Sequence, residues 1–186
     1  MSAICHFSRD AFRGKQQIAE GSPGSASVSG VTDEMPQTVS ARTTIAAPPA
    51  VVFAIVADPH QHPRIDGSGS VRAVVEGPDR LAKGDTFHVS MKLFGLPYKI
   101  TNHVVELEPE RRIAWRHFGG HRWRYELTPT ADGGTEVVET FDYSRYRGLS
   151  KAFVELLGFP ARNRSGIEGT LRRLKDAAEA DAAAQA

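Results

Sequence analysis

The stretch ADPHQHPRIDGSG (residues 57–69) places two histidines and two aspartates close together. Imidazole and carboxylate groups are common metal ligands, and a zinc site needs at least three of them from the protein. His60 and His62 are two residues apart, so on a helical turn they point to different sides, whereas an extended segment lets them share a face. Asp58 or Asp66 would have to supply the third ligand. We favour a solvated loop over a metal site here, and we expect no bound metal.

A histidine and a carboxylate further along the chain form a second candidate for chemistry. His117 has the strand parity of Trp115, and Glu139 has the parity of Val137 and Phe141. Both polar groups are therefore expected to face inward, where each needs a partner. A His117–Glu139 pair could perform general acid–base work, with the carboxylate orienting the imidazole, or it could hold a ligand hydroxyl without any reaction. A bulge that turned Glu139 outward would remove this pair.

Composition and motifs exclude several classes of function. The chain of 186 residues is long enough for one well-cored domain, and its formal net charge of +1 gives no overall attraction to nucleic acid or an anionic membrane. Cys5 is the single cysteine, so no internal disulfide forms. No run approaches the ~20 apolar residues of a membrane span, and no secretory signal is visible. We expect a cytoplasmic protein. No nucleophile elbow, phosphate-binding loop or HExxH motif occurs, so no cofactor is expected.

The segment RRIAWRHFGGHRWRYEL (residues 111–127) is basic and aromatic, which could suggest single-stranded nucleic-acid binding. Strand parity separates the two kinds of side chain, because the aromatic rings take one face while Arg116, Arg122 and Arg124 take the other. A nucleic-acid platform would need both on one surface, so we expect no nucleic-acid partner. The arginine face remains a candidate contact for another protein.

The elements that must position these residues follow from periodicity and turn signals. Residues 1–39 are rich in Ser, Gly and Pro without a periodic apolar face, so we predict disorder there. Met35 is also a conceivable start, a reading that would leave residues 1–34 outside the protein. A short strand follows, then a helix after Pro48-Pro49. About six strands come next, with Gly119-Gly120 as a two-residue hairpin signal. The expected strands are at 41–47, 70–76, 85–93, 98–107, 112–118, 121–128 and 135–144.

The C-terminal part of the domain has helical periodicity. Ile167, Leu171, Leu174 and Ala178 fall on one face of a long amphipathic helix, which Gly158 and Pro160 separate from an earlier helical turn. Residues 181–186 are predicted to be a frayed tail. An antiparallel sheet needs a cover for its apolar face, and this helix is the candidate. We therefore predict an α+β fold in which a curved antiparallel sheet of about seven strands leaves a ligand-sized space beneath the helix.

The order of elements and four local stretches resemble the START-like, helix-grip (SRPBCC) superfamily, in its bacterial polyketide cyclase/dehydrase and lipid-transport branch. The stretches are TTIAAPPAVVFAIVADPHQHPRI, GDTFHV, WRYELTPTADGGTEVVETFDYS and GIEGTLRRLKDAAE, within a domain at residues 40–180. The resemblance implies a helix-grip fold with a second short helical turn after the first helix. It also implies that Pro63 and Ile65 close one end of a cavity, with the loop of His60 and His62 near its mouth.

Parity, together with the helical segment, gives a set of inward-facing residues that are expected to line the cavity. Most of them are apolar and could simply be core, so the polar members carry more information. The predicted ligand-binding residues are Ile65, Phe87, Val89, Met91, Ile100, Asn102, Trp115, His117, Trp123, Tyr125, Glu139, Phe141, Tyr143, Phe153 and Leu157.

Three functions follow from this interpretation. The leading one is binding of a hydrophobic small molecule, lipid-like, aromatic or polyketide-like, between the sheet and the C-terminal helix. The second is a polyketide cyclase or dehydratase that uses His117 or Glu139 to move protons. The third is a toxin-like or regulatory module that contacts another protein through its arginine face. Fold resemblance alone does not decide among them.

Overall fold

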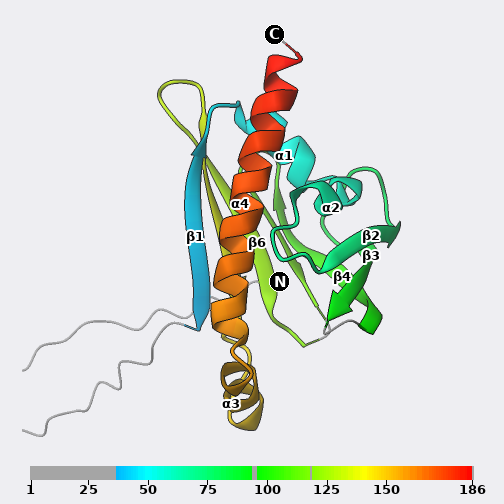
Figure 1. Cartoon of the computed structure of the whole chain (residues 1–186). Coiled ribbons are helices and arrows are strands. Elements are labelled where there is room, and N and C mark those ends of the chain that lie inside the picture. Colours follow the sequence, from blue (N-terminus) through cyan, green and yellow to red (C-terminus); the bar gives the residue numbers. More distant parts are fainter. Residues whose placement is uncertain (1–36, 94–95, 118, 186) are drawn as a thin grey trace, which may run out of the picture. The chain divides into compact units, whose positions relative to one another are not determined.

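The structure is a computed structural model that describes residues 37–93, 96–117 and 119–185, without the side chains of residues 72–75, 92–93 and 153–154 (Figure 1). The predicted disordered segment 1–39 therefore lies almost wholly outside the described residues. Within the described ranges, no helix is long and apolar enough to cross a membrane. The elements are β1 (Thr38–Ile45), α1 (Pro49–Val56), the 3₁₀-helix η1 (Pro59–Gln61), α2 (His62–Ile65), β2 (Val71–Glu76), β3 (Thr86–Leu93), β4 (Leu96–Glu108), β5 (Arg112–Arg116), β6 (Arg122–Pro129), β7 (Thr135–Asp142), α3 (Leu149–Leu156) and α4 (Phe159–Ala183).

The seven strands form one antiparallel sheet in the order β1-β7-β6-β5-β4-β3-β2. Strands β2 to β7 follow one another as neighbours, and β1 returns to pair with β7 along its whole length. Helix α4 packs against β1, β7, α1 and α2, so it runs across the same face of the sheet that the two short helices cover (Figure 1). The predicted α+β helix-grip fold is confirmed.

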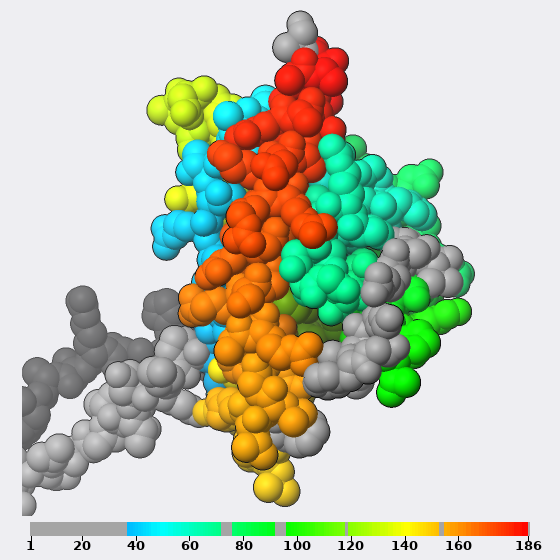
Figure 2. All heavy atoms as spheres, in the orientation of Figure 1, coloured from blue at the N-terminus to red at the C-terminus, as the bar shows by residue number. Residues whose placement is uncertain are grey.

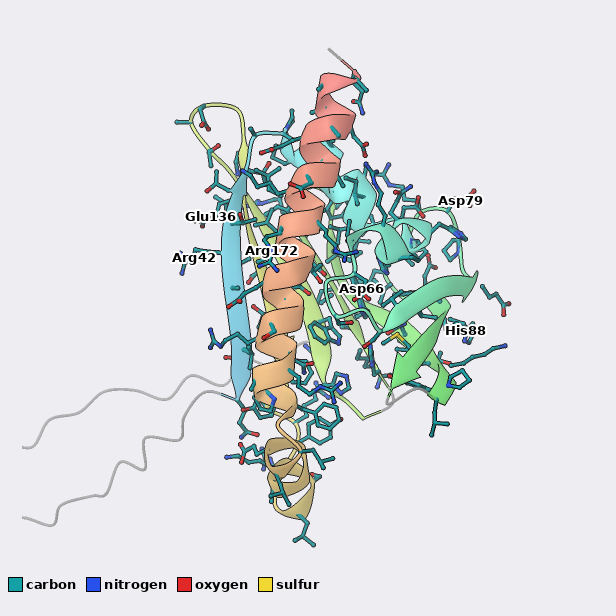
Figure 3. All side chains as sticks on the ribbon, in the orientation of Figure 1. Arg42, Asp66, Asp79, His88, Glu136 and Arg172 are labelled. Carbon is teal, nitrogen blue, oxygen red and sulfur yellow. The ribbon has the colours of Figure 1, made fainter. Side chains whose placement is uncertain are left out.

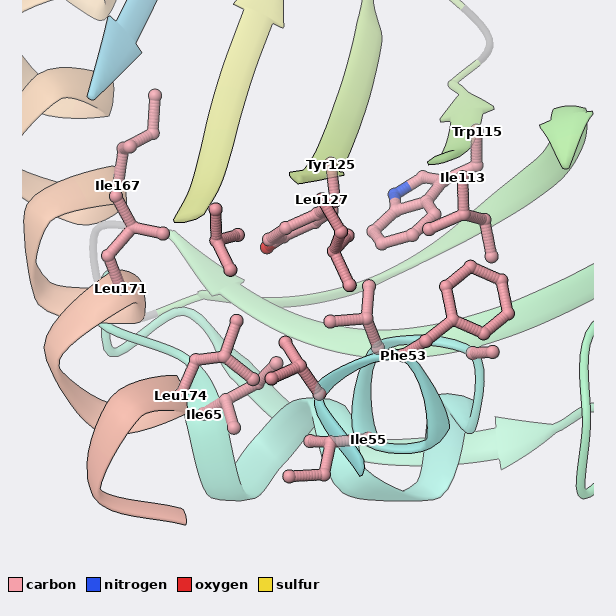
Figure 4. Packing of buried hydrophobic residues seen from close by; sticks show 14 of the residues in the cluster. Phe53, Ile55, Ile65, Ile113, Trp115, Tyr125, Leu127, Ile167, Leu171 and Leu174 are labelled. Carbon is pink, nitrogen blue, oxygen red and sulfur yellow. The ribbon is translucent and has the colours of Figure 1, made fainter. Parts of the chain in front are cut away.

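The core lies between this inner face and the helices. The four residues predicted for the inner side of α4 (Ile167, Leu171, Leu174 and Ala178) are all buried. They belong to one buried cluster that also includes Phe53 of α1 and inward-facing side chains of the strands, part of which Figure 4 shows. Burying each such side chain stabilises the fold by roughly 1.5–3 kcal/mol before entropy is subtracted. The region around these residues, between the sheet and helices α1 and α4, is therefore filled by the protein's own side chains.

The loop after α2 docks on α4 through two glycines. A Cβ on Gly67 would lie 2.0 Å from the backbone N of Thr170, and a Cβ on Gly169 would lie 2.9 Å from the Cα and O atoms of Gly67. The Gly67 N–H also donates to Thr170 Oγ1 at 3.0 Å. Backbone approaches as close as these require residues without a side chain. Gly67 in the DGSG stretch thus allows the close backbone packing that holds the loop against the helix.

Most strands have at least one end that differs by one to three residues from the prediction, and three differences between predicted and observed boundaries matter here. Strand β1 begins at Thr38, inside the segment expected to be disordered, because Val39 is buried opposite Phe141. Helix α4 continues to Ala183, beyond the expected start of the tail at residue 181. Strand β5 ends at Arg116 and β6 begins at Arg122, so residues 117–121 connect them, with the His117 N–H donating to the His121 carbonyl beside the last ladder pair. The expected two-residue hairpin at Gly119-Gly120 is wrong.

Candidate functional site

An aromatic floor crosses the inner face of the sheet on β5, β6 and β7. Trp115 lies opposite Trp123, and Trp123 lies opposite Phe141, so the three rings form one row. The ring centroids of Trp123 and Phe141 are 5.0 Å apart, and those of Trp115 and Tyr125 are 5.6 Å apart. Phe87 on β3 meets Trp115 edge-on at 5.7 Å. The strand parity that the sequence predicted for these residues is the one observed.

Glu139 lies in the next row, directly opposite Tyr125, with its side chain only 3% exposed. The Tyr125 hydroxyl donates a hydrogen bond to the Glu139 carboxyl group. Burial raises the pKa of Glu139 to about 8; the bond from Tyr125 opposes this shift and the negative charge of Asp66 adds to it. The carboxyl group is therefore protonated at neutral pH. Its Oε2 atom is buried and has no hydrogen-bond partner.

Asp66, in the loop after α2, lies near enough to this row for its charge to act on Glu139 and Tyr125. Its carboxylate accepts hydrogen bonds from the backbone N–H groups of Ser68 and Val71, which fix its position. Figure 3 labels Asp66 between α4 and β2, in front of the sheet. Burial, followed by the charge of Glu139, holds the pKa of Tyr125 well above its ordinary value of 10. The local field thus favours neutral Glu139 and neutral Tyr125.

Asn102 is the second buried polar residue of the inner face without full hydrogen bonding. It lies on β4 opposite Phe87, is 1% exposed, and its Oδ1 atom has no partner. A buried amide oxygen left unpaired costs roughly 1–3 kcal/mol, so proteins seldom keep one without a use. Asn102 and Glu139 together offer two unused polar atoms on an otherwise aromatic and aliphatic surface.

A cluster of two histidines and a tyrosine lies at the end of the inner face nearest α3. The rings of His117 and His121 have centroids 4.5 Å apart, and His121 Nδ1 is 2.9 Å from the Tyr146 hydroxyl. Burial, followed by the charge of His121, lowers the pKa of His117 to about 3, and burial lowers the pKa of His121 to about 4. Both imidazoles are therefore neutral at physiological pH. The structure places His117 and Glu139 in different pairs, so the expected pair between them is not formed.

His62 is a correction to the sequence interpretation. Instead of lying in a solvated loop, it is 8% exposed and stacks on Trp115 with ring centroids 5.0 Å apart. Its Nε2 is 3.0 Å from the Val56 carbonyl oxygen, and burial lowers its pKa, so the neutral ring donates this bond. His60, in contrast, is exposed, with Nε2 3.8 Å from Asp79. The two histidines of the HQH stretch thus point to different environments.

Most predicted ligand-binding residues gather on the inner face, and a few do not. Leu157 is 48% exposed, so it faces away from the core, whereas Met91 is partly buried and packs against the core. The side chain of Phe153 lies outside the described part of the structure. The remaining members are buried or partly buried there: Ile65, Phe87, Val89, Ile100, Asn102, Trp115, His117, Trp123, Tyr125, Glu139, Phe141 and Tyr143.

Exposure of the inner-face side chains rises toward α3. Ile113 on β5 is fully buried, as is Phe53 of α1 above the sheet, whereas Trp123, His117 and His121 are only partly buried. Figure 2 shows the green of the sheet at the bottom of a narrow depression between α4 and the loop after α2. The aromatic floor and its polar neighbours are thus nearest to solvent at this end.

Two surface hollows of the described residues lie elsewhere. One of about 330 Å³ opens between α1 and the end of α4, and one of about 350 Å³ is lined by Arg64, Arg173, Asp176 and Ala177. Neither contains a predicted ligand-binding residue. Among the described residues, no group of three or more His, Cys, Asp or Glu side chains is arranged to hold a metal ion.

The outer face of the sheet carries an ion-pair network. Glu106 accepts hydrogen bonds from Arg122 at 3.1 Å and from Arg124 at 2.9 Å, and Arg112 lies 3.5 Å away. These bonds, above all the one from Arg124, lower the pKa of Glu106. The arginine face expected to be free for a protein partner is therefore largely engaged within the sheet, and Arg116 is its exposed member.

The sequence interpretation missed His62, His121, Asp66 and Tyr146 as neighbours of the site. His121 has the parity of Trp123 and Tyr125, so period-2 counting contained its signal. His62 is three residues before buried Ile65, which is the spacing of one helical face. Tyr146 follows the last strand in irregular chain, and no local pattern marks it.

Comparison with known proteins agrees with this architecture. A family model described as polyketide cyclase / dehydrase and lipid transport matches residues 36–179. The "Uncharacterized protein Rv0088" of Mycobacterium tuberculosis (strain ATCC 25618 / H37Rv) is 45% identical over 148 residues, which cover 78% of this chain and 66% of that protein. A second relative, "Uncharacterized protein MT0096" of the CDC 1551 / Oshkosh strain, matches to the same extent. The chain spans just under two thirds of the length of these curated relatives.

Solved structures share the fold at low sequence identity. The solution structure of an AHSA1-like protein from Aeromonas hydrophila superposes with a TM-score of 0.57 and 21% identity, covering 77% of this chain and 93% of that one. The crystal structure of protein Ms6760 from Mycobacterium smegmatis gives 0.57 and 19%, covering 81% and 93%. At such identities the likeness concerns the fold alone.

Proposed function

This chain belongs to the polyketide cyclase / dehydrase and lipid transport family, and on that premise we propose that it binds a hydrophobic small molecule, lipid-like, aromatic or polyketide-like, on the inner face of its sheet. The supporting observation is the pair of buried, unpaired polar atoms, Glu139 Oε2 and Asn102 Oδ1, beside an aromatic floor. Protein interiors normally satisfy such atoms, and a ligand is one way to do so.

The protonation states indicate what the ligand carries. Protonated Glu139 accepts from Tyr125 through one oxygen and has a hydroxyl left to donate, which suits a ligand carbonyl group. The Asn102 Oδ1 atom accepts, which suits a ligand hydroxyl. The aromatic floor supplies most of the binding free energy through apolar burial. An apolar framework with a carbonyl and a hydroxyl group fits this set best.

Entry of the ligand is proposed at the α3 end, where the inner-face side chains are most exposed. Neutral His117 and His121 would meet the ligand there without placing a charge against it. The single cysteine, Cys5, suits a reducing compartment, and cytoplasmic action is part of the proposal.

Native mass spectrometry of the protein purified from its own host tests this function. We expect one equivalent of a co-purifying apolar molecule in the wild type. In Glu139→Leu, which removes the free donor, the affinity for that molecule should fall by about five- to a hundredfold. Glu136→Gln is the matched control, since Glu136 lies on the same strand but faces outward toward Arg42.

Retention of the molecule by Glu139→Leu as tightly as by the Glu136→Gln control would place the ligand elsewhere. A host-purified protein without any bound small molecule would remove the proposal itself. Glu139→Leu leaves the buried Tyr125 hydroxyl without its acceptor, at a cost of about 1–3 kcal/mol, so circular dichroism of the variant checks that it folds before its affinity is compared.

An enzyme of the cyclase or dehydratase type is the second candidate, and the raised pKa of Glu139 is the observation that favours it. A carboxylic acid that stays protonated to about pH 8 can act as a general acid near neutrality. Incubation with polyketide-like substrates separates the two functions. Turnover that disappears in Glu139→Gln, while ligand binding and folding remain, would favour the enzyme; binding without turnover would favour the carrier.

A further inference from the structure

Exposed large apolar side chains are confined to one end of the described molecule. They are Leu96 and Tyr98 at the start of β4, and Leu149, Leu156 and Leu157 on and just after α3. Leu149 is 91% and Leu156 is 85% exposed, and at seven residues apart they lie on the same side of α3. Such clustering differs from the scattered single exposures of an ordinary surface.

The same two segments are strongly basic. Residues 96–99 and 143–167 contain six Lys or Arg and one acidic residue, Glu155, which gives a formal charge of +5. The whole chain has a formal charge of +1, so the rest of it carries −4. Lys151 is partly buried, and the other five basic side chains are exposed: Lys99, Arg145, Arg147, Arg162 and Arg164. Positive charge is therefore concentrated where the leucines are.

The two segments lie near each other in the folded domain. Burial raises the pKa of Tyr98, and the positive charge of Arg162, in the first turns of α4, lowers it. The Arg162 guanidinium therefore lies near the Tyr98 ring. Burial raises the pKa of Tyr143, just after β7, and the negative charge of Glu155 on α3 raises it further, which places α3 near that residue. Figure 1 shows α3 at the end of the domain opposite the C-terminus of α4. We call this end, made by residues 96–99 and 143–167, the basic apolar end.

We propose that the basic apolar end docks the protein on an anionic lipid surface, with the leucines of α3 in the headgroup region and the basic side chains against lipid phosphates. Interfacial segments combine these two features, an apolar stripe and Lys or Arg around it. Charge complementarity favours anionic lipid over a neutral bilayer. Nucleic acid is disfavoured because four of the five exposed apolar side chains are aliphatic leucines, which cannot stack on bases.

This inference goes beyond the proposed ligand and does not depend on it. It concerns the outer surface of α3, whereas the ligand proposal concerns the inner face around Glu139. The two are neighbours, since the inner-face side chains become more exposed toward α3. A docked protein would thus present its proposed entrance to the membrane.

Co-sedimentation with lipid vesicles tests the inference on the full chain. We expect binding to vesicles of phosphatidylcholine and phosphatidylglycerol in a three-to-one ratio, weak binding to phosphatidylcholine alone, and loss of binding at half-molar NaCl. Arg147→Glu with Lys151→Glu should weaken the partition coefficient by about twentyfold or more, at about fivefold per basic side chain. Leu149→Ser with Leu156→Ser should weaken it by about tenfold or more.

Two controls keep the outcome specific. Arg80→Glu reverses an exposed charge in the loop between β2 and β3, outside the basic apolar end, and should bind like the wild type apart from a small salt-dependent change. Glu139→Leu should also bind vesicles normally, which separates a failure of this inference from a failure of the ligand proposal. The leucines to be replaced are exposed, so both α3 variants should fold, as circular dichroism would check.

Wild-type protein that stays in the supernatant with anionic vesicles would overturn the inference. Equal binding by the wild type and both α3 double variants would do so as well. If sedimentation velocity shows a dimer that Leu149→Ser with Leu156→Ser dissociates, and vesicles are not bound, the end is a self-association surface and the lipid inference is wrong.

Discussion

The wild type should lose stability as pH rises because Glu139 ionises, and the variant Glu139→Gln should not show this loss. The folded-state pKa of Glu139 is about 8, above its ordinary value of 4.5, because the carboxyl group is buried. Between these two pH values the folded chain holds a proton that the unfolded chain has released. The free energy of unfolding contributed by Glu139 is therefore fully present below about pH 4.5 and decreases until the pH passes about 8.

The magnitude follows from proton linkage. Each pH unit in this window lowers the free energy of unfolding by about 1.4 kcal/mol, so Glu139 costs about 3 kcal/mol at pH 7 and about 5 kcal/mol above pH 8, relative to acid conditions. Glutamine has nearly the shape of the protonated acid and does not titrate. The variant should therefore match the wild type near pH 5 and exceed its stability by about 3 kcal/mol at pH 7.

Three histidines also make the free energy of unfolding depend on pH, but their contribution is the same in the wild type and in Glu139→Gln. Burial lowers the pKa values of His62, His117 and His121, so the unfolded chain takes up protons below pH 6.5 that the folded chain does not. Their contribution to stability falls as pH falls, opposite in sign to that of Glu139. Both proteins keep these histidines, and the difference between their unfolding free energies isolates residue 139.

Urea unfolding at pH 5, 6, 7 and 8 of the wild type, Glu139→Gln and Glu136→Gln is the assay. Glu136 lies on the same strand, with its side chain 40% exposed and 3.9 Å from Arg42, so its variant reports the effect of removing an outward-facing carboxyl. A stability difference between Glu139→Gln and the wild type that does not change with pH would refute the reasoning, because Glu139 would then titrate alike in both states.

Three further predictions concern packing and charge. Gly169→Ala should lower the thermal midpoint and the free energy of unfolding, the latter by about 1–3 kcal/mol, because its Cβ would meet Gly67 backbone atoms at 2.9 Å. Gly166→Ala, whose nearest contact is 3.4 Å, is the control and should be neutral or stabilise by up to about 1 kcal/mol. Equal losses in the two variants would argue against the glycine contact. His62→Ala should cost about 2–4 kcal/mol in chemical denaturation, since it opens a cavity and removes ring stacking; a loss below half of that would mean a solvated side chain after all. Glu106→Gln should cost about 1–2 kcal/mol at low salt and less at high salt, because three arginines lose their carboxylate; a salt-independent loss would contradict the ion-pair account.

The sequence predicted the residues on each face of the sheet well, because side-chain direction in a strand depends only on residue parity. Trp115, Tyr125, Glu139 and Phe141 all point inward, as the alternation indicated. Helical spacing likewise identified the buried face of α4, including Leu174. These are properties of single elements, which local pattern specifies.

Pairing between elements could not be read in the same way. Parity put His117 and Glu139 on one face. Which side chains are neighbours on that face depends on the register of three adjacent strands, and this register places Glu139 beside Tyr125 and His117 beside His121. The connection between β5 and β6 runs from residue 117 to residue 121, longer than the predicted two residues, and the two histidines stand at its ends. Register depends on hydrogen bonds between strands and on turn geometry together.

By itself the sequence determined the order of elements, the α+β class and the two faces of each strand, since these follow from periods of 2 and 3.6 residues and from turn residues. Only the tertiary structure decided that His62 is buried against Trp115, that Asp66 acts on Glu139, and that the exposed leucines of α3 share one end of the domain with Leu96. The physical reason is that burial and electrostatic shifts depend on which atoms surround a group in space, and residues distant in the chain supply those atoms.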